Sequence, residues 1–281
     1  MKADYLAIDM GMTNIDLVWA DGAGWYRQKM ENQFGSPQDQ VRQALTAAGH
    51  VLTANTQIGV TGGHYRALPT VLDGYTLHKV DEMQALGLGG LAAAQLEAGL
   101  VVSAGTGTAM VAARCGDVQH VTGSAVGGGT LVGLSKVILG TANIDEIDRL
   151  ALTGDTGAVD VMLSEAVGGE VGRLPSNANA VNMGKLGAGG DFKREDLAAG
   201  LVRLVAQVIA VIAINAANAA DLKDIILIGH TMDLASVQQE ITLVGEFYQR
   251  GFIMPDHPGF ATARGVLAVL QQNLAVNTVP D

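Results

Sequence analysis

The sequence is poor in cysteine and in positive charge. Cys115 is the only cysteine among 281 residues, so an intrachain disulfide and a zinc site with several thiolates are both excluded. Lys and Arg number 17 against 28 acidic residues, and a chain of net charge -11 lacks the basic surface that nucleic-acid phosphates require. We therefore expect no nucleic-acid partner, and the single cysteine favours a reducing compartment, the cytoplasm.

Long uncharged stretches are also rare. The first residues, MKADYLAIDMG, reach an acid before an apolar run of signal-peptide length, so we expect no export signal. Residues 204–222 are nearly uncharged and long enough to span a membrane. Because Gln207, Asn215 and Asn218 interrupt that stretch, we expect a helix buried in the core or in a subunit interface, and no membrane partner.

Glycine, in contrast, is abundant and marks the turns of an α/β protein. The 37 glycines far outnumber the 6 prolines and separate apolar runs of strand length from patterns of helical period. Ser36 is a candidate cap for the first helix. In the first hundred residues we expect strands at 6–9, 15–20, 25–30, 57–63 and 75–82, and helices at 37–50 and 83–99.

A similar order of elements begins again near residue 100. Residues 100–123 repeat a strand, a glycine turn, a strand, a Gly-Asp hairpin and a strand, roughly 95 residues after the first copy. The sequence DIILIGH at 224–230 likewise echoes QIGVTGG at 57–63. This repeat predicts two related lobes, residues 1–97 and 98–281, each a mixed sheet flanked by helices. In the second lobe we expect helices at 130–139, 145–152, 155–166, 194–220 and 260–274, and a last strand at 252–257.

Three glycine turns are candidates for binding phosphate. They lie at Gly11–Thr13, Gly105–Thr108 and Gly127–Gly129. Successive backbone amides in such turns form an anion nest, although a single turn of this kind is more often a tight hairpin. The third turn leads into an apolar helix, where free amides and the helix dipole both favour a phosphate.

Three acidic residues at the ends of predicted strands are candidates for metal binding or acid–base catalysis. Asp9 ends a buried strand at the first glycine turn, which suits either a Mg²⁺ ligand or a cap of its own turn. Asp81 and Glu82 end a later strand and could be a carboxylate pair with a general base, or a plain helix cap. The six histidines show no metal-ligand spacing, so we expect surface or core positions for them.

Taken together, these motifs resemble those of the type II pantothenate kinases, members of the actin, hexokinase and Hsp70 superfamily. The resemblance covers nearly the whole chain, and its motifs occur in the family's order. They are Asp9–Thr13, Val80–Glu82, Gly105–Thr108, Gly123 with Gly127–Gly129, Asn182–Gly184, Ile228–Gly229 and Gly259–Gly265.

The resemblance implies an α/β fold of two ribonuclease-H-like lobes, with mixed sheets flanked by helices and ATP in the cleft. It implies phosphoryl transfer from MgATP to the primary hydroxyl of pantothenate, with Glu82 as general base and Asp9 as Mg²⁺ ligand. It also implies a homodimer that pairs through the helix near 194–220, and substrate contacts from Thr106 and His120. The implied ATP-binding residues are Gly11, Thr13, Gly105, Thr106, Gly107, Thr108, Gly127, Gly128, Gly129 and Gly229.

The chain departs from the family pattern at two positive charges. Asp16 stands where family members carry a lysine that reaches the ATP phosphates, and Gln119 and His120 stand in place of an arginine that contacts substrate. Another hydroxylated acceptor, or a nucleotide-binding regulator with weak catalysis, is the alternative that these departures suggest. The candidate replacement cations are Lys79, Lys136, Lys185 and a protonated His120.

Overall fold

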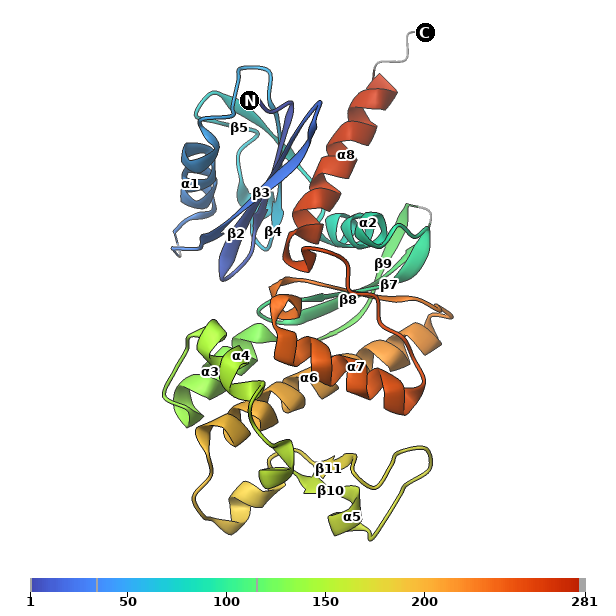
Figure 1. Cartoon of the computed structure of the whole chain (residues 1–281). Coiled ribbons are helices and arrows are strands. Elements are labelled where there is room, and N and C mark those ends of the chain that lie inside the picture. Colours follow the sequence, from blue (N-terminus) through green and yellow to red (C-terminus); the bar gives the residue numbers. More distant parts are fainter. Residues whose placement is uncertain (1, 34, 115, 278–281) are drawn as a thin grey trace.

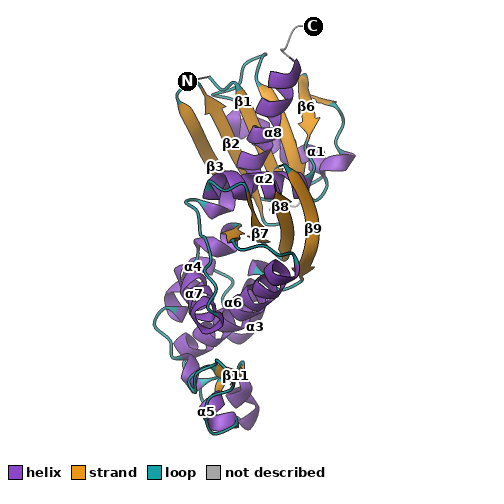
Figure 2. Ribbon diagram, turned by 90° about the vertical axis from the view of Figure 1, so that its right-hand side faces the viewer, coloured by secondary structure: helices purple, strands orange, loops and turns teal. Residues whose placement is uncertain are grey.

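The computed structural model describes residues 2–33, 35–114 and 116–277, so Cys115 lies outside the described residues. Two lobes are stacked along the long axis of the molecule (Figure 1), and a smaller region with α5, β10 and β11 extends from the second lobe (Figure 2). Each lobe is built on a mixed sheet with helices on its faces, as the repeated pattern predicts.

The first lobe contains a six-stranded sheet in the order β3-β2-β1-β4-β6-β5. The strand β1 pairs antiparallel with β2 and parallel with β4, so the expected strand, turn and hairpin are confirmed. The elements are β1 (Tyr5–Met10), β2 (Asn14–Asp21), β3 (Gly24–Glu31), α1 (Pro37–Ala48), β4 (Gln57–Gly62), η1 (Tyr65–Ala67), β5 (Val71–Leu72) and β6 (Tyr75–Lys79).

Alternation along β1 and β2 gives this sheet two different faces. Larger side chains such as Leu6, Ile8 and Leu17 pack under α1, whose first amides are capped by Ser36 as expected. Small residues such as Ala7 line the other face, together with Gly59. A Cβ at Gly59 would lie 2.4 Å from the side chain of Val266, so the small residues allow a helix from the end of the chain to lie against this face.

The second lobe repeats the sheet order of the first. Its strands run β12-β7-β8-β9, with β7 antiparallel to β8 and parallel to β12. Equivalent glycines follow the parallel strands: Gly62 has φ 104° and lies against Met10, and Gly229 has φ 95° and lies against Ala104. This correspondence supports the predicted common origin of the lobes. The strands are β7 (Ala98–Ala104), β8 (Thr108–Arg114), β9 (Asp117–Ser124) and β12 (Ile225–Ile228).

Helices cover one face of the second sheet. The long helix α6 (Arg194–Ala219) lies in its core, among buried residues that include Leu201, Ile209 and Leu227. Among the described helices it alone is long and apolar enough to cross a membrane, and 67% of its most apolar window is buried in the protein. Its neighbours include α3 (Gly128–Ile138), α4 (Ile144–Ala151) and α7 (Ala235–Tyr248), and η4 (His230–Asp233) directly precedes α7.

Two helices connect the lobes by packing against each other. The helix α2 (Glu82–Ala94) follows the first sheet but contacts β7, β8 and β9, and α8 (Ala261–Asn277) returns to contact β1, β2 and β4. Their backbones touch: a Cβ at Gly89 would lie 2.0 Å from the carbonyl oxygen of Ala261, and one at Gly265 would lie 1.9 Å from that of Ala85. The predicted division at residues 97 and 98 stays a prediction.

Two expected elements are wrong. The helix predicted at 155–166 is instead the short helix η2, the strand β10 and one helical turn, α5, because the amides of Leu163 and Ser164 donate to the carbonyls of Ala178 and Ser176 and not to residues one helical turn earlier. Of the strand predicted at 252–257, only Ile253 bridges Ile226. The remaining elements are η2 (Thr156–Ala158), β10 (Val161–Met162), α5 (Leu163–Ala166), β11 (Asn179–Val181), η3 (Gly184–Ala188) and η5 (Pro258–Phe260).

Candidate functional site

The first glycine turns of the two lobes meet. The hydroxyl oxygens of Thr13, after β1, and Thr106, after β7, are 2.9 Å apart, within hydrogen-bonding distance. Gly11 has no room for a side chain, because a Cβ there would lie 2.9 Å from the carbonyl oxygen of Asn14. The structure therefore brings two of the three predicted phosphate-binding turns together, one from each lobe.

The third glycine turn packs directly on the second. The amide of Gly128 donates to the carbonyl of Gly105 at 2.8 Å, and the amide of Gly129 donates to that of Thr106 at 2.9 Å. A Cβ at Gly127 would lie 2.8 Å from the carbonyl oxygen of Thr106. These glycines therefore shape one continuous loop, and the amides of Gly128 and Gly129 already have acceptors within it.

Gly229 joins the same loop through its neighbour. The hydroxyl of Thr231 donates to the carbonyl of Gly105 at 3.0 Å, just beyond the turn at Gly229. A Cβ at Gly128 would lie 2.6 Å from the same hydroxyl oxygen. All predicted nucleotide-binding segments of the second lobe thus lie in one contiguous group.

Asp9 is the centre of a group of titratable side chains. Burial, together with the nearby carboxylates of Asp16 and Glu82, raises the pKa of Asp9 to about 8, against the lowering effect of His230. Among the described residues no hydrogen bond holds the Asp9 carboxylate to its own turn, so the capping alternative gains no support. The charges of two further acids and a histidine therefore act on Asp9 at the end of β1.

The residues Asp81 and Glu82 have different roles in the fold. Asp81 caps α2 by accepting from the amides of Met83 and Gln84 at 3.0 and 3.3 Å, so the capping interpretation holds for Asp81. Burial raises the pKa of Asp81, but hydrogen bonds from Tyr65, Arg66 and these amides outweigh it and lower that pKa. Burial first, and then the Asp81 charge, raise the pKa of Glu82, as a general base requires.

Asp16 meets a cation that comes from the other lobe. Nε2 of His230 lies 2.8 Å from Oδ1 of Asp16, and Nδ1 of His230 lies 2.6 Å from Oδ2 of Asp233. The histidine ring needs the glycine at 259, because a Cβ there would lie 2.1 Å from Nδ1. An imidazole between two carboxylates is held in its charged form, so His230 neutralises the acid at position 16.

The other candidate cations are not brought to Asp9. Nζ of Lys79 donates to the carbonyl of Arg66 at 3.1 Å, and Nζ of Lys185 forms an ion pair with Glu165 at 2.8 Å. Lys136 is exposed on α3. His120 is exposed on β9, and within the described part of the chain its side chain makes no hydrogen bond or ion pair.

The carboxylate of Asp9 fits a Mg²⁺ ion that keeps most of its water. No group of three metal-ligating side chains occurs in residues 2–33, 35–114 and 116–277. Mg²⁺ in phosphoryl-transfer sites is bound by one or two carboxylates, with waters and substrate phosphates completing the shell. Asp9 would hold such an ion directly or through water, and the ion would neutralise charge on the phosphates.

His230 is the residue that sequence reasoning missed. It directly follows Gly229, the turn after β12, so its position next to a predicted binding turn was a usable signal. Its acidic partner lies 214 positions away, which no local pattern reveals.

Comparisons with known proteins agree with this geometry. The Fumble family model matches residues 94–268, more than half of the chain. A type II pantothenate kinase of Oceanobacillus iheyensis is 27% identical over 179 residues, covering 62% of this chain and 66% of the relative. The pantothenate kinase 1 of Arabidopsis thaliana is 30% identical over 179 residues, covering 59% and 46%. The matches thus span two thirds or less of these relatives.

Solved structures support the predicted fold. The activator of the 2-hydroxyisocaproyl-CoA dehydratase from Clostridium difficile, with bound ADPNP, superposes with a TM-score of 0.67 at 14% identity and covers 99% of this chain and 98% of its own. A ROK family glucokinase from Streptomyces griseus, in complex with glucose and AMPPNP, gives 0.59 at 13% identity, covering 95% and 99%. The two-lobed actin-like ATPase fold is confirmed, and the chain belongs to the Fumble family.

Proposed function

We propose that the chain is an ATP-dependent kinase that phosphorylates the primary hydroxyl of pantothenate, a step toward coenzyme A. The single observation that carries the proposal is the gathering of Asp9 and Glu82 beside glycine turns from both lobes. Sequence similarity to type II pantothenate kinases supports pantothenate as the acceptor. The use of ATP as donor also supports a cytoplasmic location.

Each group has a defined task in this reaction. Asp9 would hold Mg²⁺, whose charge offsets that of the ATP phosphates. Glu82, at the start of α2, would accept the proton of the attacking hydroxyl. Amides of the turns at Gly11 and Gly105–Thr108 would position the phosphates, while Thr106 and His120 remain proposed substrate contacts.

The test compares product formation by the wild type, a Glu82 variant and a control variant. Purified protein is incubated with MgATP and pantothenate, and phosphopantothenate is measured by mass spectrometry. Glu82→Ala should lower the rate about 10²- to 10⁴-fold, the usual contribution of a general base. Glu97→Ala, which removes an exposed acid further along the same segment, is the matched control. Wild-type product at the Glu82→Ala level would contradict the proposal.

A second candidate is a protein that binds nucleotide without rapid transfer, or a kinase for another acceptor. The Asp16–His230 ion pair favours this second candidate. Both ring nitrogens of His230 bond to carboxylates, so no donor is left for a phosphate. Calorimetry with MgATP separates the candidates. Tight ATP binding without phosphopantothenate supports the second, and absence of binding at millimolar ATP contradicts both.

We also propose that the chain forms a homodimer through α6. Its side away from the core carries the half-buried Leu204 and Val208, one helical turn apart, and the exposed Asn215. Val208→Asp should convert a dimer to a monomer in sedimentation velocity. An unchanged sedimentation coefficient would place any dimer contact elsewhere.

A further inference from the structure

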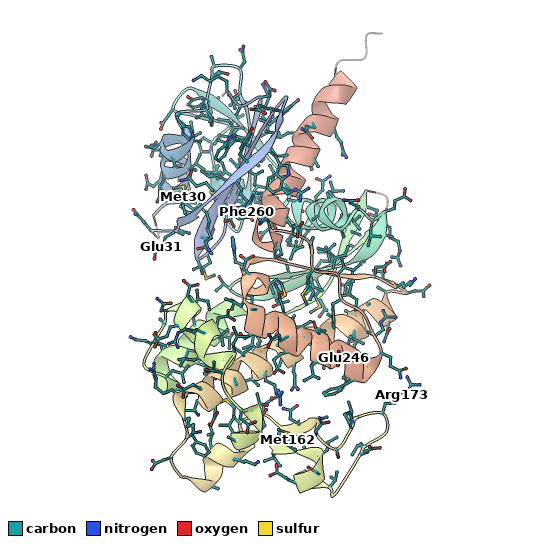
Figure 3. All side chains as sticks on the ribbon, in the orientation of Figure 1. Met30, Glu31, Met162, Arg173, Glu246 and Phe260 are labelled. Atoms are coloured by element: carbon teal, nitrogen blue, oxygen red, sulfur yellow. The ribbon has the colours of Figure 1, made fainter. Side chains whose placement is uncertain are left out.

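A basic and aromatic cluster lies outside the predicted site, on the edge strand of the first lobe. It consists of Trp25 and Arg27 on β3, Phe260 at the end of η5 and Arg264 in the first turn of α8. The guanidinium carbon of Arg264 lies 4.6 Å from the centre of the Trp25 ring. That of Arg27 lies 5.6 Å from Trp25 and 5.7 Å from Phe260. Figure 3 labels Phe260 where the last helix begins, beside the strands of the first sheet. We call these four residues the arginine cluster.

The fold assembles the cluster from both ends of the sequence. Trp25 and Arg27 pair with Ala20 and Val18, so all four lie on the face of the sheet that α8 covers. Because the residues under α8 are small, the helix lies close to the sheet and its first turn brings Arg264 over the indole.

The two arginines lack acidic partners in a strongly acidic protein. Other arginines of the chain, including Arg42, Arg66 and Arg203, form ion pairs with carboxylates. Within the described residues, neither Arg27 nor Arg264 has a carboxylate at ion-pair distance or an acceptor for a side-chain hydrogen bond. In a chain of net charge -11, two neighbouring arginines without an acid make a local positive charge that attracts an anion from outside the chain.

The aromatic contacts leave the hydrogen-bonding edges of the guanidinium groups unused. A guanidinium above a ring interacts through its face, whereas its five N–H donors lie in its plane. Burial lowers the pKa of Arg264, which means that its charge is partly removed from water. Arg27 is exposed and Arg264 is half-buried, so the N–H donors of both groups face solvent and are available to an oxyanion.

We propose that Arg27 and Arg264 bind the oxyanion group, a carboxylate or a phosphate, of a small molecule. Such planar or tetrahedral anions are the ligands that guanidinium donors fit best. Lys29, two residues further along the same face of β3, adds positive charge, although it pairs in register with Asp16. The cluster also contacts the link between the lobes, since Phe260 packs edge-on against His230 at 5.4 Å.

The fluorescence of Trp25 provides the test. The chain has two tryptophans, so a Trp19→Phe background leaves Trp25 as the single one. Trp19 stacks on Tyr26 and is not part of the arginine cluster, so its replacement leaves the cluster unchanged. Inorganic phosphate and acetate are titrated separately to about 50 mM at constant ionic strength, so that screening does not change. We expect a saturable change with at least one anion, and the anion that saturates identifies the chemical group.

Three variants make the test specific. Arg27→Gln and Arg264→Gln should each raise the dissociation constant about tenfold or more, the usual effect of losing a charged hydrogen-bond donor. Arg149→Gln removes the same charge from an exposed site on α4 and should bind as wild type does. Arg264→Lys keeps the charge but not the planar donors, and should bind less tightly than wild type even where Arg264→Gln fails to fold. The proposal is overturned if neither anion saturates, or if the folded arginine variants bind like the Arg149→Gln control.

Discussion

Nε2 of His230 lies 2.8 Å from Oδ1 of Asp16, so an ion pair from the second lobe closes on the first. Both side chains are largely buried, with 17% and 7% of their surface exposed. The positive charge that the family pattern places on the first lobe is here supplied from the opposite lobe. The acid at position 16 is therefore part of the contact between lobes and not an unpaired charge in the site.

The first prediction concerns His230 and the pH dependence of stability. Burial lowers the pKa of His230, but the hydrogen bonds to Asp16 and Asp233 outweigh it and raise the pKa to about 9. A raised histidine pKa stabilises the folded state fully below the unfolded value, about 6.5, and this stabilisation is lost as pH rises toward 9. Urea unfolding should show that the free energy of unfolding falls between pH 6.5 and 9 in the wild type. In His230→Gln this fall should be smaller by on the order of 2 kcal/mol.

The control for this experiment is His64→Gln, which changes an exposed histidine. It should keep the wild-type dependence of unfolding free energy on pH. Equal curves for His230→Gln and wild type would mean that the ion pair contributes nothing to the contact between lobes.

The second prediction concerns Asp9 and metal binding. Burial, then Asp16 and Glu82, raise the pKa of Asp9 to about 8, so this carboxyl is protonated at neutral pH in the metal-free protein. Mg²⁺ must displace that proton, and the affinity for Mg²⁺ should therefore increase as pH rises from 7 to 9. Calorimetry in buffers of different ionisation heat measures the released proton. Asp9→Asn should release none, whereas Asp4→Asn, an exposed acid, should behave as wild type does.

The third prediction concerns Glu82 and the rate of transfer. Because burial and the Asp81 charge raise its pKa, the acidic limb of the rate profile should lie above the ordinary glutamate value of about 4.3. In Glu82→Gln the remaining activity should lose this limb. A profile with the same limb in the variant would assign the base to another residue.

The fourth prediction concerns the helix crossing at Gly265. A methyl group there would lie 1.9 Å from the carbonyl oxygen of Ala85, so Gly265→Ala should destabilise the protein by about 1–3 kcal/mol or more. Gly133→Ala is the matched control, because Gly133 is an exposed position of α3 with open space around it. It should raise stability by about 0.4–1 kcal/mol. Thermal unfolding of both variants measures the difference, and similar melting temperatures would contradict the close contact.

Much of the fold could be predicted because short sequence patterns determine most of its helices, strands and turns. Alternating apolar residues and glycine turns predicted the two sheets and their repeat, and motif order predicted the family. The helix expected at 155–166 does not form because the amides of Leu163 and Ser164 bond to Ala178 and Ser176, contacts that the periodicity of the sequence does not reveal. The partner of Asp16 was missed for the same reason, since the contact joins residues far apart along the chain.

The return of α8 to the first sheet has a consequence for synthesis on the ribosome. Ala7, Val18 and Gly59 are made within the first quarter of the chain, yet the helix that covers them begins only at Ala261. Until then an apolar sheet face is left open beside unfinished chain, a state in which nascent proteins aggregate or recruit chaperones. Completion of the first lobe therefore waits until α8 has been synthesised.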